Sequence, residues 1–400
     1  MSFYLECYDK KECFNCTACA TICPQKCITM QLNKKDGYIY PQIDKSKCTN
    51  CGMCKKICIN VNNEKMQREI KSSYVLYNKE EETRKNSSSG GISSILMEFT
   101  VENNGVVYGA CYDNKMNVVH ARAETLEECE KFKTSKYVRS NIENIYNQVL
   151  EDLRNGRLVL FTGTPCQVAG IKTIAEIKKL DKNLLLCEIM CDSVASPILF
   201  RKFKEQIEKK YDKEVKNINF RSKQNGAHIK SMEITFKNEE KIILPLNKNN
   251  LYSEYMQIFG CGLSAPESCS NCHFEHTNER VADFTIGDYW GRKEVLKDDN
   301  KGISLMLINS EKGKEIFKIK IQDKVIYQEV STDIALDNNH TKPKKNILNK
   351  KQFMDDLPVL SFDELSKEYV RKFRWRTKMG KIIPKELKEK IKYILIKIKK

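Results

Sequence analysis

Short apolar runs alternate with longer segments of helical spacing between residue 72 and about residue 330. Runs typical of buried strands occupy residues 74–77, 157–161, 184–190 and 302–309. Strand-like alternation also marks residues 215–246 and a predicted hairpin of 105–112 with 117–121. Helices are predicted near residues 92–99, 125–132, 142–155, from about 168, 192–210 and 311–321. The pattern predicts a larger α/β domain with mixed sheets over residues 72–330.

The flanking segments lack this alternation. Residues 1–66 are rich in cysteine and polar residues, and we expect them to form a separate small domain. Residues 331–370 are predicted to be an irregular extension, and residues 371–400 a basic amphipathic tail. In the tail, apolar side chains fall on one helical face among lysines: Ile383, Leu387, Ile391, Ile394, Leu395 and Ile398.

The net charge of +16 is concentrated in this tail. Residues 371–400 contain 13 Lys/Arg and 2 Asp/Glu, whereas the first 370 residues contain 56 and 51. The charge of the body is nearly balanced, so we expect no nucleic-acid-binding face. We expect the tail helix either to contact an anionic membrane surface or to pack on its own domain.

No run of about 18 apolar residues is present, so we predict no transmembrane helix. Residues 1–7 lack a basic segment followed by an apolar stretch, so no secretory signal is expected. The 18 cysteines are then interpreted as metal ligands in a reducing compartment rather than as disulfides. We expect a cytoplasmic protein, peripheral at the inner face of the membrane if the tail binds lipid.

Two cysteine runs near the N-terminus repeat with an offset of 35 residues. Each has the spacing Cys-x2-Cys-x2-Cys-x3-Cys of bacterial dicluster ferredoxins, in which the fourth cysteine ligates the cluster of the other run. The first [4Fe-4S] cluster is expected on Cys13, Cys16, Cys19 and Cys58. The second is expected on Cys48, Cys51, Cys54 and Cys23. Paired CxxC motifs also bind zinc, but eight cysteines in two phased runs fit zinc poorly.

With this motif the predicted fold class is α+β. A small bacterial-type dicluster ferredoxin domain precedes a larger α/β domain with mixed sheets, and a basic helix ends the chain.

Loops at two strand ends of the larger domain are candidate ligand sites. Ser87–Gly91 lead into a helix N-terminus, where backbone amides favour phosphate, although an ordinary N-cap explains the same pattern. Gly163–Gln167 follow a buried strand and carry Cys166, a reactive or ligating thiol or simply a buried one. The next strand ends at Cys191, so two consecutive strands each deliver a cysteine.

Cys269 and Cys272 form one more CxxC pair, followed by His273. The string CxxCH matches covalent haem attachment, which is disfavoured without export, and zinc on Cys269, Cys272, His273 and His276 is an alternative. Two further cluster ligands are the simpler interpretation. Residues 283–291 are predicted to be a strand leading to a loop with one acid, Asp288, and two aromatic residues.

Several motifs in order resemble the coenzyme F420 hydrogenase/dehydrogenase beta-subunit family. They are SSSGG at residues 87–91, KYV at 136–138, GTPCQ at 163–167, PESCSNC at 266–272, IGDYWG at 286–291 and GISL at 302–305. The resemblance implies FAD bound by the large domain, with Ser88, Ser89, Gly90, Gly91, Gly163, Thr164, Gln167 and Asp288 as candidate contacts. It also implies a third [4Fe-4S] cluster on Cys166, Cys191, Cys269 and Cys272. Cys261 competes with Cys191 for the fourth position, because it precedes the Cys269–Cys272 pair on a glycine-rich loop.

This sequence departs from the family at one point: Asp192-Ser193 follow Cys191 where the family commonly has His-Gly. Members with a fused ferredoxin are similar to proteins linked to polysaccharide biosynthesis, so the resemblance does not make the deazaflavin coenzyme the substrate. We expect an iron–sulfur flavoprotein oxidoreductase that exchanges electrons with a redox partner protein or low-potential donor. The alternatives are a non-catalytic electron-transfer subunit of a larger complex and a membrane-surface scaffold.

Overall fold

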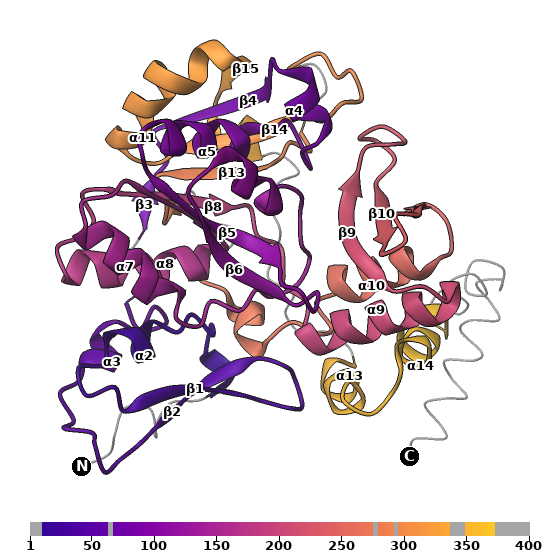
Figure 1. Cartoon of the computed structure of the whole chain (residues 1–400), viewed down its shortest axis with the longest axis horizontal. Coiled ribbons are helices and arrows are strands. Elements are labelled where there is room, and N and C mark those ends of the chain that lie inside the picture. Colours follow the sequence, from indigo (N-terminus) through magenta and orange to yellow (C-terminus); the bar gives the residue numbers. More distant parts are fainter. Residues whose placement is uncertain (1–9, 63–66, 275–278, 292–294, 337–348, 373–400) are drawn as a thin grey trace, which may run out of the picture.

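An eight-stranded mixed sheet forms the centre of the molecule (Figure 1). The computed structural model describes residues 10–62, 67–274, 279–291, 295–336 and 349–372. The strand order is β15-β4-β14-β13-β8-β7-β5-β6, in which β5, β7, β8 and β13 are mutually parallel. The strands are β4 (Ser72–Asn78), β5 (Val106–Tyr112), β6 (Val118–Ala123), β7 (Val159–Gly163), β8 (Leu184–Ile189), β13 (Phe284–Asp288), β14 (Ser304–Ile308) and β15 (Val325–Val330).

Alternate side chains of the central strands enter two separate cores, as the pleat of a strand requires. Leu184 and Leu186 of β8 face one core, and Leu185 and Cys187 face the other. Helices cover both faces. They are α7 (Ile145–Arg154) and α8 (Pro165–Ile177) on one side, and α5 (Ile92–Glu102) and α11 (Glu311–Ile316) with its π-helical continuation η5 (Phe317–Ile321) on the other.

The cysteine-rich region is a small lobe against the face that carries α7 and α8 (Figure 1). It consists of η1 (Lys10–Glu12), α2 (Ala18–Ile22), α3 (Met53–Lys56) and the antiparallel hairpin β1 (Ile28–Leu32) and β2 (Ile39–Ile43). Its apolar side chains Phe14, Ala18, Ile22, Ile57 and Ile59 belong to the same core as α7 and α8. The lobe is therefore packed onto the large domain.

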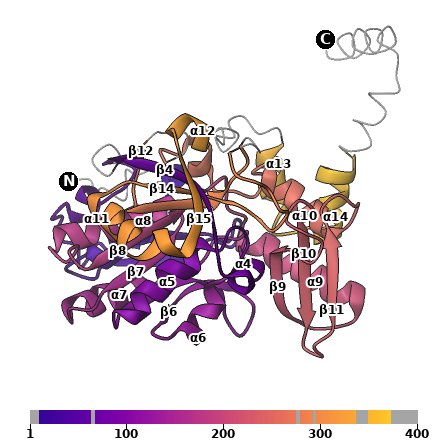
Figure 2. The same ribbon diagram turned by 90° about the horizontal axis from the view of Figure 1, so that it is seen from above.

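A second lobe lies beside the central sheet (Figure 2). Its antiparallel sheet contains β9 (Val215–Ser222), β10 (Ser231–Phe236) and β11 (Lys241–Pro245), as the alternation in 215–246 predicted. The helices of this lobe share one apolar core with the sheet. They are α9 (Pro197–Tyr211), α10 (Leu251–Gly260), α13 (Lys350–Asp356) and α14 (Phe362–Ser366) with its π-helical end η7 (Lys367–Arg371).

Short elements complete the connections. They are the ribbon of β3 (Arg68–Glu69) with β12 (Glu279–Arg280), and the helices α4 (Glu81–Lys85), α6 (Leu126–Cys129), η3 (Glu130–Phe132), η4 (Glu267–Asn271), η6 (Gln322–Lys324) and α12 (Thr332–Leu336).

Two sequence expectations about elements are wrong. Residues 331–370 are not irregular where the structure describes them, because Phe353, Phe362 and Leu365 bury one face of each helix in the second lobe. The helix expected from about Val168 begins at Pro165, because Thr164 and Gln167 form a capping box.

The predicted tail helix, residues 381–400, lies outside the described residues. Within the part of the chain that is described, none of the helices has the length and apolar character needed to span a bilayer.

Candidate redox centres

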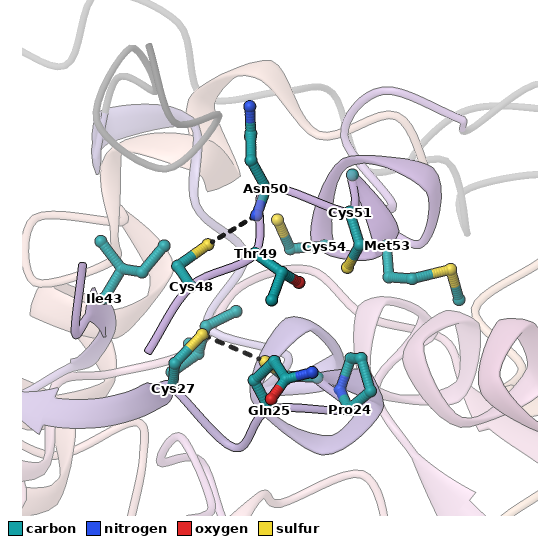
Figure 3. Close-up of a pocket in the computed structure, with 13 residues that line it drawn as sticks. Pro24, Gln25, Cys27, Ile43, Cys48, Thr49, Asn50, Cys51, Met53 and Cys54 are labelled. Carbon is teal, nitrogen blue, oxygen red and sulfur yellow. Dashed lines mark hydrogen bonds between the residues drawn. The ribbon is translucent and has the colours of Figure 1, made fainter. Parts of the chain in front are cut away.

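A cavity of about 430 Å³, counting its open mouth, joins the two cysteine runs (Figure 3). Its lining includes Cys23 from the first run and Cys48, Cys51 and Cys54 from the second. The spacing rule assigned this set to the second cluster. The structure therefore brings the four thiols together around one space, and their soft sulfur donors suit iron.

The first-cluster cavity, of about 420 Å³, is lined by Cys13, Cys16, Cys19 and Cys58, the set predicted for the first cluster, and the cavity described above is the second-cluster cavity. Cys54 also lines it, so the two cavities are neighbours. The donor chemistry of both cavities fits a [4Fe-4S] group held by four cysteines.

The backbone repeats between the two runs in the same way as the sequence. Residues two and four places after the first cysteine have left-handed φ in both runs: Asn15 (54°) and Thr17 (60°), then Asn50 (52°) and Gly52 (74°). The tight turn points an amide at sulfur, because Asn15 N donates to Cys13 Sγ and Asn50 N to Cys48 Sγ, both at 3.4 Å. The local chain is thus shaped to wrap a thiolate-bound group.

Several of these thiols are at least partly buried. Burial raises the pKa of Cys16, Cys19 and Cys54 above its usual range. A buried thiol gives up its proton when a metal supplies the compensating positive charge. Ligation at these cavities should therefore release protons.

Cys27 is a buried thiol that the spacing rule left without a role. Its sulfur lies 3.3 Å from Cys23 Sγ and lines the second-cluster cavity. Burial, then the contact with Cys23, raises the pKa of Cys27 to about 12.

We expect Cys27→Ala to keep the second cluster and Cys23→Ala to lose it. The first substitution removes only a sulfur neighbour, which should make the cluster harder to reduce. Iron analysis checks this: Cys23→Ala should lack about four iron atoms relative to Cys27→Ala. Equal iron loss in both variants would contradict the assignment of Cys23.

The third predicted cysteine set is spread over three segments. Cys166 lies in the first turn of α8, directly after β7, and Cys191 follows the neighbouring parallel strand β8. Their places at one sheet edge match the expectation from the sequence. Cys269 lies in η4, and Cys272 is its C-cap residue. The competing Cys261 is exposed at the end of α10.

A buried arginine connects this third set to the ferredoxin lobe. Arg139, 7% exposed, donates from Nη1 to Cys166 Sγ at 3.1 Å. Its Nη2 donates to the carbonyl oxygens of Phe14 (2.7 Å) and Asn15 (2.9 Å), inside the first cysteine run. Burial acts to lower the pKa of Arg139, but the thiols of Cys166 and Cys269 keep it above its usual value. Arg139 is therefore a fixed cation between two cysteine sites.

A second contact joins the same two sites. Ser268 Oγ donates to Cys13 O at 2.9 Å, and Tyr38 OH donates to Ser264 O at 2.7 Å. The segment that carries Cys269 is thus held against the ferredoxin lobe.

Within the described residues, no three His, Cys, Asp or Glu side chains are grouped closely enough to hold a metal ion.

The two loops proposed for FAD lie at one edge of the central sheet. β4 is antiparallel to β14, which is antiparallel to β13, so β4 runs in the same direction as β7 and β8. Residues 87–91 after β4 and 163–167 at the end of β7 therefore share the carboxyl edge, where α/β sheets bind ligands.

The SSSGG loop has structural reasons for its glycines. A Cβ on Gly90 would lie 2.8 Å from Leu76 O, and Gly91 has φ 82° at the N-cap of α5, where no side chain caps the helix. Ser88 Oγ accepts from Ser135 N, and Ser89 Oγ donates to Ile303 O, both at 2.8 Å. The loop is held by protein contacts with the amides of α5 directly after it.

Thr164 and Gln167 are engaged with protein groups. The Gln167 side-chain oxygen accepts from Thr164 N, and its Nε2 donates to Ser140 Oγ at 2.9 Å. Asp288, at the end of β13, pairs with Arg221 of β9 at 2.7 Å. The structure describes where these predicted contacts lie, and their role toward FAD stays a prediction.

Two lysines that sequence reasoning missed lie at this edge, one of them against Trp290 of the predicted IGDYWG motif. Lys223 Nζ donates to Arg84 O at 2.6 Å and to Ser89 O, and burial lowers its pKa to about 8. Lys230 Nζ lies 3.8 Å from the centre of the Trp290 ring. Both lysines lie in the connection between β9 and β10, which only the fold brings to this edge, so no local signal marked them. Their positive charge fits the phosphates of a dinucleotide.

Comparisons with known proteins agree with the two-part arrangement. Residues 156–333 match the family model for the C terminus of the coenzyme F420 hydrogenase/dehydrogenase beta subunit. Residues 12–60 match the family model for a 4Fe-4S dicluster domain. No curated protein matches the chain.

One solved structure, "Xenon derivatization of the F420-reducing [NiFe] hydrogenase complex from Methanosarcina barkeri", contains a chain with 15% identity and a TM-score of 0.45. The match covers 75% of this chain and 91% of that chain. On the two family matches, the protein carries an N-terminal 4Fe-4S dicluster domain joined to the C-terminal domain of the coenzyme F420 hydrogenase/dehydrogenase beta-subunit family.

Proposed function

We propose that the protein is an iron–sulfur flavoprotein that passes single electrons between a partner and FAD. The observation that carries this proposal is the Arg139 bridge, which holds the first cysteine cavity directly against the segment of Cys166. In the proposal three [4Fe-4S] groups occupy the three cysteine sets, and FAD lies at the carboxyl edge of the central sheet.

Bound FAD would supply two-electron exchange with an organic substrate, and the clusters would supply one-electron transfer. The residues of the chain have separate tasks. The thiols hold iron and the left-handed turns direct amides at sulfur. The Lys223 ammonium and the first turn of α5 favour an anionic phosphate. Arg139 excludes water from the contact between the lobes and stabilises negative charge on the thiolate groups beside it.

The metal and flavin content of the protein tests the proposal. Anaerobically purified protein should contain about 12 iron atoms per chain, since twelve cysteines hold three [4Fe-4S] groups. Sulfide should match iron, and about one FAD should be released on denaturation. About eight iron atoms would remove the third cluster alone, and zinc at Cys269 and Cys272 would also contradict it. Protein that contains no flavin and does not bind added FAD would contradict the flavin part of the proposal.

A non-catalytic electron-transfer subunit of a larger redox complex is the second candidate. It is favoured by the packing of the ferredoxin lobe on the large domain, which suits a chain that relays electrons between other proteins. Repeated turnover by the isolated, flavin-loaded chain, in which electrons from an artificial one-electron donor reduce a two-electron acceptor, would support an enzyme. Electron uptake from dithionite without turnover of any two-electron substrate would support the subunit.

A further inference from the structure

The two ferredoxin-type cavities differ in their surroundings. The first-cluster cavity is covered by the large domain, because Cys13, Phe14 and Asn15 are buried under Arg139 and Ser268. The second-cluster cavity, lined by Cys23, Cys48, Cys51 and Cys54, opens to the protein surface. Asn50, Cys51 and Gly52 are exposed at its mouth, and Cys48 and Cys54 are partly exposed. Exchange of electrons with another protein is therefore easiest at the second cavity.

The rim of the second cavity is strongly basic. We define the rim as residues 23–28 and 44–56, which contribute most of the cavity lining. It contains one acidic residue, Asp44, which pairs with Lys47 at 3.2 Å. Against it stand five exposed lysines: Lys26, Lys45, Lys47, Lys55 and Lys56. The first 370 residues hold 56 basic and 51 acidic residues, so this short rim carries most of their excess.

The mouth of the second-cluster cavity, which the rim encloses, is partly apolar. Pro24 is exposed, and Ile43 and Met53 are partly exposed beside the thiols (Figure 3). An apolar centre surrounded by positive charge suits a negatively charged protein surface. Opposite charges speed the encounter of the two proteins, and apolar contact stabilises the complex once it has formed. A flat anionic surface such as a lipid bilayer would contact the lysines but not the apolar centre, so the rim fits a protein partner better.

We propose that this rim is the docking surface for an acidic one-electron carrier protein. The inference rests on the proposed function, because it needs a redox group in the second cavity. In each encounter one electron leaves the reduced partner and enters the oxidised one, and no bond or proton is exchanged. The interface should be small and transient, as in other electron-transfer pairs.

Charge reversal at the end of α3 tests the proposal. Lys55→Glu/Lys56→Glu changes two exposed rim lysines that ligate nothing. The matched control is Lys34→Glu/Lys35→Glu, which makes an equal charge change on exposed residues. These lysines lie at the turn of the β1–β2 hairpin, about 15 Å along the strands from the end that borders the rim. The probe is a purified plant-type ferredoxin with net negative charge. Two quantities are measured anaerobically at salt concentrations between about 20 and 500 mM: the dissociation constant of the complex with this ferredoxin, and the second-order rate constant of electron transfer between the two proteins.

Wild-type protein should react fastest at low salt and slow steeply as salt rises. Lys55→Glu/Lys56→Glu should lower the low-salt rate constant and the affinity by about tenfold or more and flatten the salt dependence. The control should stay within about twofold of wild type. Lys26→Gln/Lys47→Gln, which adds no negative charge, should show a smaller loss of the same kind and replaces the first variant if that one does not fold.

The end point of dithionite reduction separates the two levels of the inference. Absence of cluster bleaching in wild-type protein would refute the proposed function. Full bleaching with unchanged carrier affinity and rate in the rim variants would overturn the docking surface alone. Equal losses in rim and control variants would also overturn it, because net charge would then explain the effect. Rim-dependent binding to phosphatidylserine vesicles, without carrier binding, would assign the rim to a membrane instead.

Discussion

Serine in place of Cys166, Cys191, Cys269 or Cys272 should remove about four of the twelve proposed iron atoms. Each substitution deletes one of four thiolates, and a cube with one weak oxygen ligand is readily lost. The eight iron atoms of the ferredoxin lobe should remain, because their cysteines line separate cavities. Iron analysis and the electron paramagnetic resonance spectrum of the reduced protein measure the loss.

Cys111 and Cys129 supply the matched controls. Both thiols are buried in the core under α5, away from the other cysteine sets. Cys111→Ser and Cys129→Ser should leave iron content and reduction unchanged. If Cys261→Ser loses the third cluster while Cys191→Ser keeps it, the ligand set is wrong by one member.

Arg139→Met should destabilise the contact between the lobes by about 3 kcal/mol, because two buried carbonyl oxygens lose their donor. Loss of the positive charge beside Cys166 should also make the nearby clusters harder to reduce. Chemical denaturation followed by circular dichroism gives the first quantity, and redox titration gives the second.

Arg139→Lys separates charge from geometry. Lysine restores the cation but not the planar fork that reaches Cys166, Phe14 and Asn15 together. The reduction potential should recover more fully than the stability. Unchanged potentials in Arg139→Met, with stability lost, would show that Arg139 acts only in packing.

The sequence predicted the parts of the site that depend on local spacing. The two Cys-x2-Cys-x2-Cys-x3-Cys runs predicted which thiols line each cavity, and strand periodicity placed Cys166 and Cys191 at neighbouring strand ends. Arg139 could not be found in this way, because its partners are 27 and 124–125 residues away along the chain.

The helices after residue 349 were missed for a different reason. Their apolar residues occur in ones and twos between charged residues, and Pro358 interrupts the segment, so the sequence was interpreted as an irregular extension. Phe353 and Leu357, four residues apart, were the available signal, and both are fully buried. Packing against the second lobe, rather than helix propensity, stabilises such short helices.

The order of strands in the central sheet limits how this protein could be rearranged in evolution. The segment that matches the beta-subunit family begins at residue 156, yet β4, β5 and β6 precede that point. β4 lies between β15 and β14, and β5 covers the edge of β7. A gene fragment starting at residue 156 would encode a sheet split in two, with open edges prone to pairing with other chains. Recombination that preserved the fold would have to transfer the chain from about residue 72 onward as one unit.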